Sequence, residues 1–340
     1  MRSRPGAITA AIAATLLAGC SGALQSGAET PPMGAPLTSA RPDTSVIAPE
    51  YRYQTPVALL PIARPRSKHV PGYVFATDYT INSVDRWKIL NPPDGSSPRK
   101  WYTLVSEPQG LAASNDSLWI ANTNASNILE LNSAGKLTKT LIDRREFPVS
   151  LALTRSNRLY VANIFNTSFA AGNVVYYDGP DRKPTGSLRN STFYQVIGIA
   201  VNGAGDVFVN NNTQNFAGGE VVEFPGGSGS GTVLTNIPVQ VAGGLAIDPK
   251  TQDLLVVDQG TGSSGASVSV YAPPYTGRAI KTYSFHESVD IALDKNGSNL
   301  YCANVNGYID VYGYPSGSFL GSYADIFEPI GVAVQPAAIP

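Results

Sequence analysis

Few residues in this sequence are of the types that usually carry catalysis. Its two histidines stand apart: His69 lies between Lys68 and Val70 before the first apolar segment, and His286 lies beside Glu287. A histidine next to a carboxylate can act as a general base, but an exposed turn position is the simpler interpretation of His286. The sequence contains no G-x-S-x-G, H-E-x-x-H or C-x-x-C motif. With only two cysteines, a zinc site of imidazole and thiolate ligands is excluded.

A more organised polar set recurs where apolar segments end. Each of six such segments closes on a carboxylate or an amide: Asp78, Asn122, Asn163, Asn211, Asp258 and Asn304. The connections that follow add Glu107, Glu287 and Glu328. Oxygens of this kind that converge on one axis could hold Ca²⁺, with Glu107, Asn163, Asn211 and Asp258 as candidate metal ligands. The alternative is structural, because Asn and Asp at strand ends bond local backbone groups, and a sixfold recurrence is what that role predicts.

An internal repeat supplies the elements that position these residues. A triplet of a small or polar residue, an aliphatic residue and alanine recurs at intervals of 40 to 48 residues: Gly110–Ala112, Ser150–Ala152, Gly198–Ala200, Gly244–Ala246, Asp290–Ala292 and Gly331–Ala333. Each of the first five leads to a second apolar strand, a third strand with large residues three apart, and a weaker fourth. Four short strands in a unit of this length are typical of a β-propeller blade.

The two ends of the repeat region complete one another. The N-terminal unit has second, third and fourth strands but no first strand, and the last triplet is a first strand with nothing after it. We therefore predict an all-β fold over residues 70–340. It is a six-bladed β-propeller with four-stranded antiparallel blades, closed by the C-terminal strand. Such a closure removes the free sheet edge that would otherwise invite aggregation.

Two features break the sixfold symmetry. Asp290 replaces the Gly or Ser of the other triplets on a strand that borders the central channel, so its carboxylate is either hydrated there or part of a polar site. Blades three to five also carry long loops after their second strands, with Phe165, Phe169 and Phe216 expected to be exposed on them. The loops are Ile164–Gly172, Thr213–Gly219 and Gln259–Ala266. Loops on a rigid scaffold often carry binding function, so we expect a ligand on this face; drift in unselected loops is the alternative.

The repeat pattern resembles NHL-repeat and related six-bladed propellers, a group that includes the gluconolactonase and senescence-marker family. The resemblance covers about residues 70–336 and implies the propeller fold. In gluconolactonase-like members it also implies a divalent ion near the channel mouth, held by Glu, Asn and Asp. It specifies no activity, because propellers host lyases, lactonases, dehydrogenases and binding modules. Two functions stay open: a binding or scaffold module without a cofactor, and a Ca²⁺-dependent hydrolase of the lactonase type.

The N-terminus reads as an export signal. Arg2 and Arg4 precede a short apolar stretch, and Leu17-Ala18-Gly19-Cys20 resembles a bacterial lipobox. We predict a signal peptide over residues 1–19, a lipid-modified Cys20, and a flexible Pro/Ser/Gly-rich tether over residues 20–69. Several acyl chains make such anchoring effectively permanent. Ser21 after the cysteine favours the outer membrane in a cell with two membranes.

The composition limits the partners. With 24 basic and 25 acidic residues the net charge is −1, which gives no basic face for a nucleic acid. Beyond the N-terminus no apolar run approaches the roughly 20 residues that span a bilayer. Cys302 lies in the apolar segment "LYCAN" and is predicted to be a small buried hydrophobe without a disulfide. We expect a monomer whose ligand is a protein or a small molecule.

Overall fold

The structure is a computed structural model that describes residues 44–46, 68–214, 217–260, 265–285 and 287–338. The chain divides into two units, Met1–Arg41 and Pro42–Pro340. The first unit, which contains Cys20, lies outside the described residues. No helix in the described part is long and apolar enough to cross a membrane.

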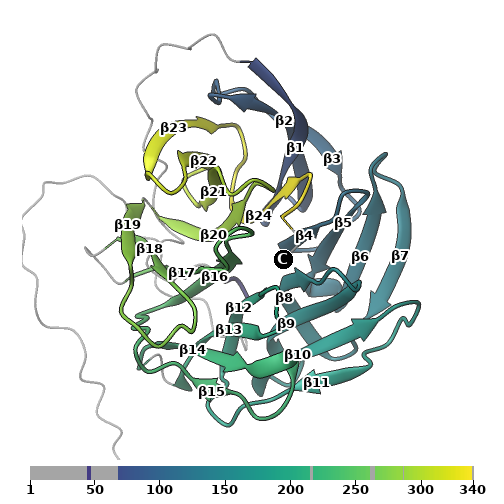
Figure 1. Cartoon of the computed structure of the whole chain (residues 1–340). Helices are drawn as coiled ribbons and strands as arrows, with labels where there is room; N and C mark the ends of the chain where they lie inside the picture. Colours follow the sequence, from purple (N-terminus) through teal and green to yellow (C-terminus); the bar gives the residue numbers. More distant parts are fainter. Residues whose placement is uncertain (1–43, 47–67, 215–216, 261–264, 286, 339–340) are drawn as a thin grey trace, which may run out of the picture. The chain divides into compact units, whose positions relative to one another are not determined.

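The second unit is a six-bladed β-propeller, which confirms the predicted fold. Six four-stranded antiparallel sheets surround a central axis, as the view along that axis shows (Figure 1). Blade one contains β24 (Pro329–Gln335), β1 (Lys68–Asp78), β2 (Ser83–Asn91) and β3 (Arg99–Tyr102), from the axis outward. Blade two contains β4 (Pro108–Ala113), β5 (Ser117–Asn122), β6 (Asn127–Asn132) and β7 (Leu137–Ile142). Blade three contains β8 (Glu146–Leu153), β9 (Arg158–Asn166), β10 (Ala171–Asp178) and β11 (Gly186–Leu188).

The other three blades repeat this order from the axis outward. Blade four contains β12 (Gln195–Val201), β13 (Val207–Asn212), β14 (Gly219–Phe224) and β15 (Thr232–Val233). Blade five contains β16 (Ala242–Ile247), β17 (Leu254–Asp258), β18 (Ala266–Tyr271) and β19 (Lys281–Phe285). Blade six contains β20 (Ser288–Leu293), β21 (Asn299–Asn304), β22 (Tyr308–Gly313) and β23 (Ser318–Tyr323). Two short 3-10 turns, η2 (Thr123–Ala125) and η4 (Pro225–Gly227), lie between strands.

The seam between the two ends of the chain forms as predicted. Strand β24 pairs antiparallel with β1 from Tyr73–Gln335 to Asp78–Pro329. The hydroxyl of Thr77 ties the seam to blade two, because it accepts the Gly331 N–H at 2.8 Å and donates to the Gln109 carbonyl at 2.7 Å. The C-terminal strand is therefore bonded within blade one and linked to its neighbour.

The glycines of the repeated triplet set the spacing between blades. A Cβ atom on Gly198 would lie 2.3 Å from the Gly243 carbonyl oxygen, and one on Gly331 would lie 2.1 Å from that of Gln109. Both contacts are with the backbone of the next blade, which cannot yield as a flexible side chain does. Glycine is therefore required at positions 198 and 331, whereas blades three and six carry Ser150 and Asp290 at the equivalent position.

Apolar side chains fill the space between neighbouring blades. Successive residues of a strand point to opposite faces of a sheet, and a blade has a neighbour on each face. The inner strands accordingly read as continuous apolar runs, and all seven residues of β12 are buried. Between blades one and two, for example, Phe75 and Val84 share a buried cluster with Leu118 and Ile120.

Candidate functional site

The central channel is a narrow cavity lined by small and aliphatic side chains and by polar backbone groups. Three successive residues of each of the six innermost strands line a volume of about 130 Å³, and alanine is the middle residue in every blade: Ala112, Ala152, Ala200, Ala246, Ala292 and Ala333. The small middle residue leaves room along the axis, and the residues beside it are mostly aliphatic. No side chain of this lining is an acid, a base or a usual metal ligand.

The C-terminal end of the chain covers one mouth of the channel. Ala337 and Ala338 line the cavity, and Ala337 forms a β-bridge with Asp294 of blade six. The Gln335 amide donates to the carbonyls of Ser114 and Asn115 in blade two, at 2.8 and 2.9 Å. We call this end, formed by Gln335, Ala337 and Ala338, the C-terminal mouth. Figure 1 views the propeller along its axis, with the C-terminus at the centre.

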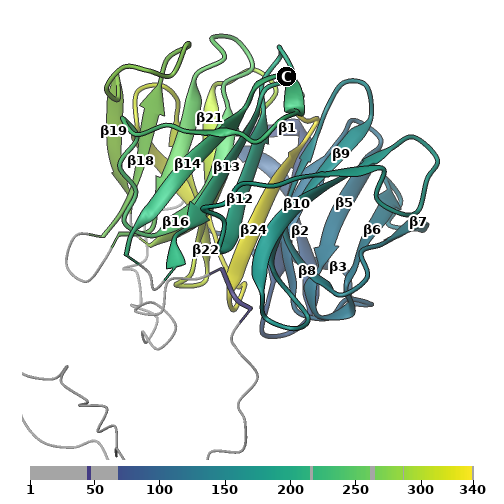
Figure 2. The same ribbon diagram turned by 90° about the horizontal axis from the view of Figure 1, so that it is seen from below.

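A short N-terminal segment, Thr44–Val46, is bound at the opposite end of the innermost strands. The Gln109 side chain donates from Nε2 to the Thr44 carbonyl at 2.7 Å and accepts the Val46 N–H on Oε1 at 2.9 Å. The Gln259 Nε2 donates to the Val46 carbonyl at 2.6 Å. All five of these residues are buried. Figure 2 shows the segment, in purple, on the side away from the C-terminus. We call this end, formed by Gln109, Gln259 and Thr44–Val46, the N-terminal mouth.

The predicted polar ring lies on the face of the N-terminal mouth, where the second strands end. Its members bond to backbone groups of their own blades. Asn122 accepts the Ser106 N–H at 2.6 Å, and Asn211 accepts the Tyr194 N–H at 2.9 Å. Asp78 accepts the Phe327 N–H at 2.7 Å. Asp258 accepts the N–H groups of Gln240 and Val241, both at 3.0 Å. In these four blades the ring residue therefore fastens the connection that enters the blade.

The asparagines of the ring use their amide nitrogen in a second common way. Each donates to a polar side chain on the third strand of its blade: Asn122 to Asn127, Asn163 to Asn173, Asn211 to Glu220 and Asn304 to Asp310, at 2.8 to 3.2 Å. Asn304 also accepts the N–H of Asn306 at 3.0 Å. These contacts bridge adjacent strands, and they support the structural interpretation of the ring.

Blade three departs from the pattern of the ring. Among the described residues, Asn163 Oδ1 has no hydrogen-bond donor, and neither do the buried oxygens Asp143 Oδ2 and Glu146 Oε2. The backbone donor is missing because the Glu146 N–H bonds to the Asp143 carbonyl at 3.2 Å. Burial, reinforced by the Glu146 carboxyl, raises the pKa of Asp143 to about 7. The carboxyl groups of Asp143 and Glu146 are therefore buried beside side-chain amides in blade three, and not all of their oxygens receive a hydrogen bond.

Asp290 bonds the backbone of the neighbouring blade. Its Oδ2 accepts the N–H of Val332 at 3.0 Å, so the carboxylate bonds β20 of blade six to β24 of blade one. Its Oδ1 occupies the space where a Cβ on Gly244 would lie, at 2.0 Å from that position. The residue keeps partial access to water, but surrounding protein atoms desolvate the carboxyl and raise its pKa to about 7.

The expectation of exposed loop phenylalanines is wrong for blade three. Phe165 is only 5% exposed and Phe169 is partly buried, and both belong to the apolar packing around the axis. The Phe169 ring stacks on Phe147 with centroids 5.8 Å apart. The predicted loop 164–172 is also shorter than expected, because β9 continues through Ile164 and Phe165 and pairs with β10 up to Ala171. Phe216 lies outside the described residues.

The candidate metal ligands come from four successive blades. Glu107 precedes blade two, and Asn163, Asn211 and Asp258 belong to blades three, four and five. Glu107 accepts the Tyr79 hydroxyl at 3.4 Å, and the other three have the contacts given above. Within the described ranges no three His, Cys, Asp or Glu side chains form a group suited to a metal ion. His286 lies outside those ranges. Cys302 is fully buried and has a free thiol, and its burial agrees with the prediction of a small buried hydrophobe.

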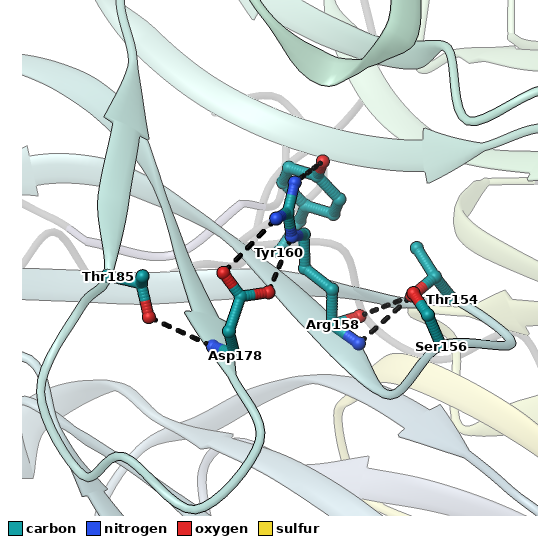
Figure 3. A network of polar contacts seen from close by, with 6 residues as sticks. All are labelled: Thr154, Ser156, Arg158, Tyr160, Asp178 and Thr185. Atoms are coloured by element: carbon teal, nitrogen blue, oxygen red, sulfur yellow. Dashed lines mark hydrogen bonds and ion pairs between the residues drawn. The ribbon is translucent and has the colours of Figure 1, made fainter.

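An ion pair between Arg158 and Asp178 joins β9 and β10 of blade three at the end of the hairpin away from its connecting loop (Figure 3). Arg158 donates from Nε and Nη2 to the two carboxylate oxygens of Asp178, at 2.6 and 3.1 Å, and its guanidinium lies 4.6 Å from the Tyr176 ring centroid. The two side chains are 34% and 37% exposed. A pair this exposed contributes little stability, about 0–1 kcal/mol, so we assign it a local role in fixing β9 against β10.

The fold and the N-terminal mouth define a closed six-bladed β-propeller whose axis is capped by its own chain. A scan against protein-family models finds no match, and a search of curated proteins finds none. Among solved structures, a chain from the crystal structure of a nidogen/laminin complex is similar, with a TM-score of 0.61 at 16% identity. The similarity covers 79% of this chain and 99% of that chain, and at this identity it shows the fold alone.

Sequence reasoning missed Gln109 and Gln259, the two residues that hold Thr44–Val46. Gln109 directly precedes the Gly110 triplet, and Gln259 directly follows the ring residue Asp258. Neither belongs to a spacing that repeats in the other blades. Their positions next to repeated residues place them near the axis, but only the fold shows that they face the same segment.

Proposed function

We propose that the protein is a binding or scaffold module of the cell envelope, attached to a membrane through a lipid on Cys20. One observation carries the binding role: the polar ring side chains in four blades fasten the propeller's own backbone. Because the ring side chains are used in this way, the rigid face of the propeller is best suited to recognising a binding partner. The similar chain from a nidogen/laminin complex supports a protein as the partner.

The recognition surface in this proposal is the face of the N-terminal mouth, next to the loops of blades three to five. On that face the connections after the second strands of blades four and five, between β13 and β14 and between β17 and β18, are longer than the corresponding connections of the other blades. Loops on a rigid scaffold can vary in sequence without cost to the core, which suits them to recognition. Phe165 and Phe169 are not part of this surface, because they pack inward.

Anchoring is tested by replacing the lipidation site. Cys20→Ala removes the thiol that would carry the lipid, so the protein should move from the membrane fraction to the soluble fraction, or stay unprocessed. Ser21→Ala is the matched control and should remain with the membranes. Membrane association of a processed Cys20→Ala variant would contradict the lipid anchor.

The binding role is tested against the alternative of a Ca²⁺-dependent hydrolase. Metal analysis of the purified protein, together with a lactone hydrolysis assay, separates the two functions. A binding module should show no lactone hydrolysis that depends on Ca²⁺. One tightly bound ion per chain together with such hydrolysis would overturn the proposal.

A further inference from the structure

The N-terminal mouth recognises main-chain groups. The three hydrogen bonds that the Gln109 and Gln259 side chains make with Thr44–Val46 all end on a backbone carbonyl or N–H of the segment. The Gln109 amide bonds the carbonyl of one residue and the N–H of the residue two positions later. A neighbouring β-strand contacts an extended peptide through the same groups, and added strands gain affinity in this way with little dependence on sequence.

One side chain of the segment adds selectivity. Val46 is 7% exposed and belongs to the buried apolar cluster of the inner strands. The pocket at this position accepts a small branched apolar residue and disfavours a charged one, because a buried charge without a partner is costly. The mouth therefore combines backbone recognition with a single apolar anchor.

The Gln109 side chain is suited to binding an extended peptide. It is fully buried, and both hydrogen bonds of its amide go to the segment. A buried primary amide that lost these partners would be left unsatisfied, so the mouth favours being filled. An extended peptide supplies a carbonyl and an N–H at the required spacing, whatever chain it belongs to.

We propose that the N-terminal mouth is a binding site for an extended peptide of a protein partner, and that Thr44–Val46 fills it in cis. The inference rests on the proposed binding function and names its ligand class. A peptide that offers main-chain groups and a small branched apolar residue displaces the chain's own segment. The segment competes at the high effective concentration of a tethered ligand, so it sets a threshold of partner affinity or concentration.

The test uses the full chain with its segment expelled. Val46→Asp places a carboxylate in the apolar pocket and should release the segment without touching Gln109 or Gln259. The probe is a fluorescent synthetic peptide with the sequence of residues 42–50, followed by anisotropy. We expect saturable binding to the variant that is at least roughly ten-fold tighter than binding to the unmodified chain, because the intramolecular competitor is gone.

Two further substitutions in the Val46→Asp chain locate the site. Gln109→Ala should abolish peptide binding. Gln335→Ala is the matched control, since Gln335 also donates to backbone carbonyls but at the C-terminal mouth, and it should leave peptide binding intact. If Val46→Asp does not fold, as judged by circular dichroism, Val46→Pro replaces it, because proline removes the N–H that Gln109 accepts but keeps an apolar side chain.

A folded segment-released variant that fails to bind the peptide would overturn the proposal. Equal binding by this variant and the unmodified chain, or binding that survives Gln109→Ala, would overturn it as well. None of these results bears on membrane fractionation of Cys20→Ala or on lactone hydrolysis. Evidence against peptide binding at the N-terminal mouth can therefore be distinguished from evidence against the proposed function.

Discussion

Amide side chains act as backbone surrogates throughout this propeller. Asn122 and Asn211 bond incoming connections, and Gln109 bonds a three-residue segment. Asn210 donates to the carbonyls of Gly243 and Val257 in the next blade, both at 3.0 Å. A side-chain amide carries the same donor and acceptor as a peptide group, so it can replace a missing strand partner. The abundance of such residues reflects structural demand at the ends of short strands.

Phe165 gives a test of which side chains are packed structure. Because it is buried beside Phe169 and Tyr194, Phe165→Ser should lower the free energy of unfolding by about 3 kcal/mol, measured by chemical denaturation. The matched control is Phe319→Ser, at a position that is 47% exposed on β23, and it should cost much less. Equal effects of the two substitutions would contradict the packing described for blade three.

The orphaned oxygens of blade three predict a pH dependence. The pKa of Asp143 is about 7 in the folded state, above its ordinary value near 4, since burial and Glu146 disfavour the charged form. Between these two values the folded state holds a proton that the unfolded state has released. The free energy of unfolding therefore includes the full contribution of neutral Asp143 below about pH 4. This contribution is lost as the pH rises through about 7.

Asp143→Asn tests this effect. Asparagine cannot ionise, and its amide can donate to the unpaired Asn163 Oδ1. The variant should be more stable than the parent by roughly 1–3 kcal/mol at pH 8, with an advantage that shrinks towards pH 4, in thermal unfolding across this range. Asp116→Asn, on an exposed turn, is the control. Asp290 also has a pKa of about 7, so some pH dependence should remain in the variant. An advantage that is the same at both pH values would contradict the assignment.

At the scale of elements, the sequence predicted the strands well where a residue type repeats for a physical reason. The triplet beginning with glycine recurs because adjacent first strands leave no space for a Cβ, as at Gly198 and Gly331. In blade three the Gly, Ser and Asn content predicts a long loop, but Ile164 and Phe165 are buried and extend β9. The competing signal, two consecutive apolar residues after Asn163, was present in the sequence.

The closing strand supports a direct test of the seam. Removing residues 331–340 leaves β1 without its inner partner and exposes apolar surface on blades one, two and six. The deletion should cost several kcal/mol, a large part of the ~5–15 kcal/mol typical of a domain, and should lower the melting temperature clearly. Removing only residues 339–340, beyond β24, should have little effect. An unchanged melting temperature in the longer deletion would contradict the closure.

At the scale of the whole molecule, the six blades and their closure followed from the repeat, but the capping of the axis did not. Residues 44–46 lie in a region whose Pro, Ser and Thr content shows no apolar period, so the sequence predicts them as part of the tether. Their binding depends on two buried glutamines that come together only when blades two and five are placed around the same axis. The candidate metal ligands also come from separate blades, and each of them has hydrogen-bond partners of its own in this structure.

The binding of Thr44–Val46 also determines how the propeller bears mechanical load. Tension applied at the N-terminus meets the segment first, where its hydrogen bonds to Gln109 and Gln259 and the buried Val46 side chain oppose the pull. Beyond it, the pull reaches β1 at Lys68, and this strand is paired on both sides, with β2 and β24. Extracting β1 would require shearing two ladders at once. We therefore expect the segment to detach under force before β1 does.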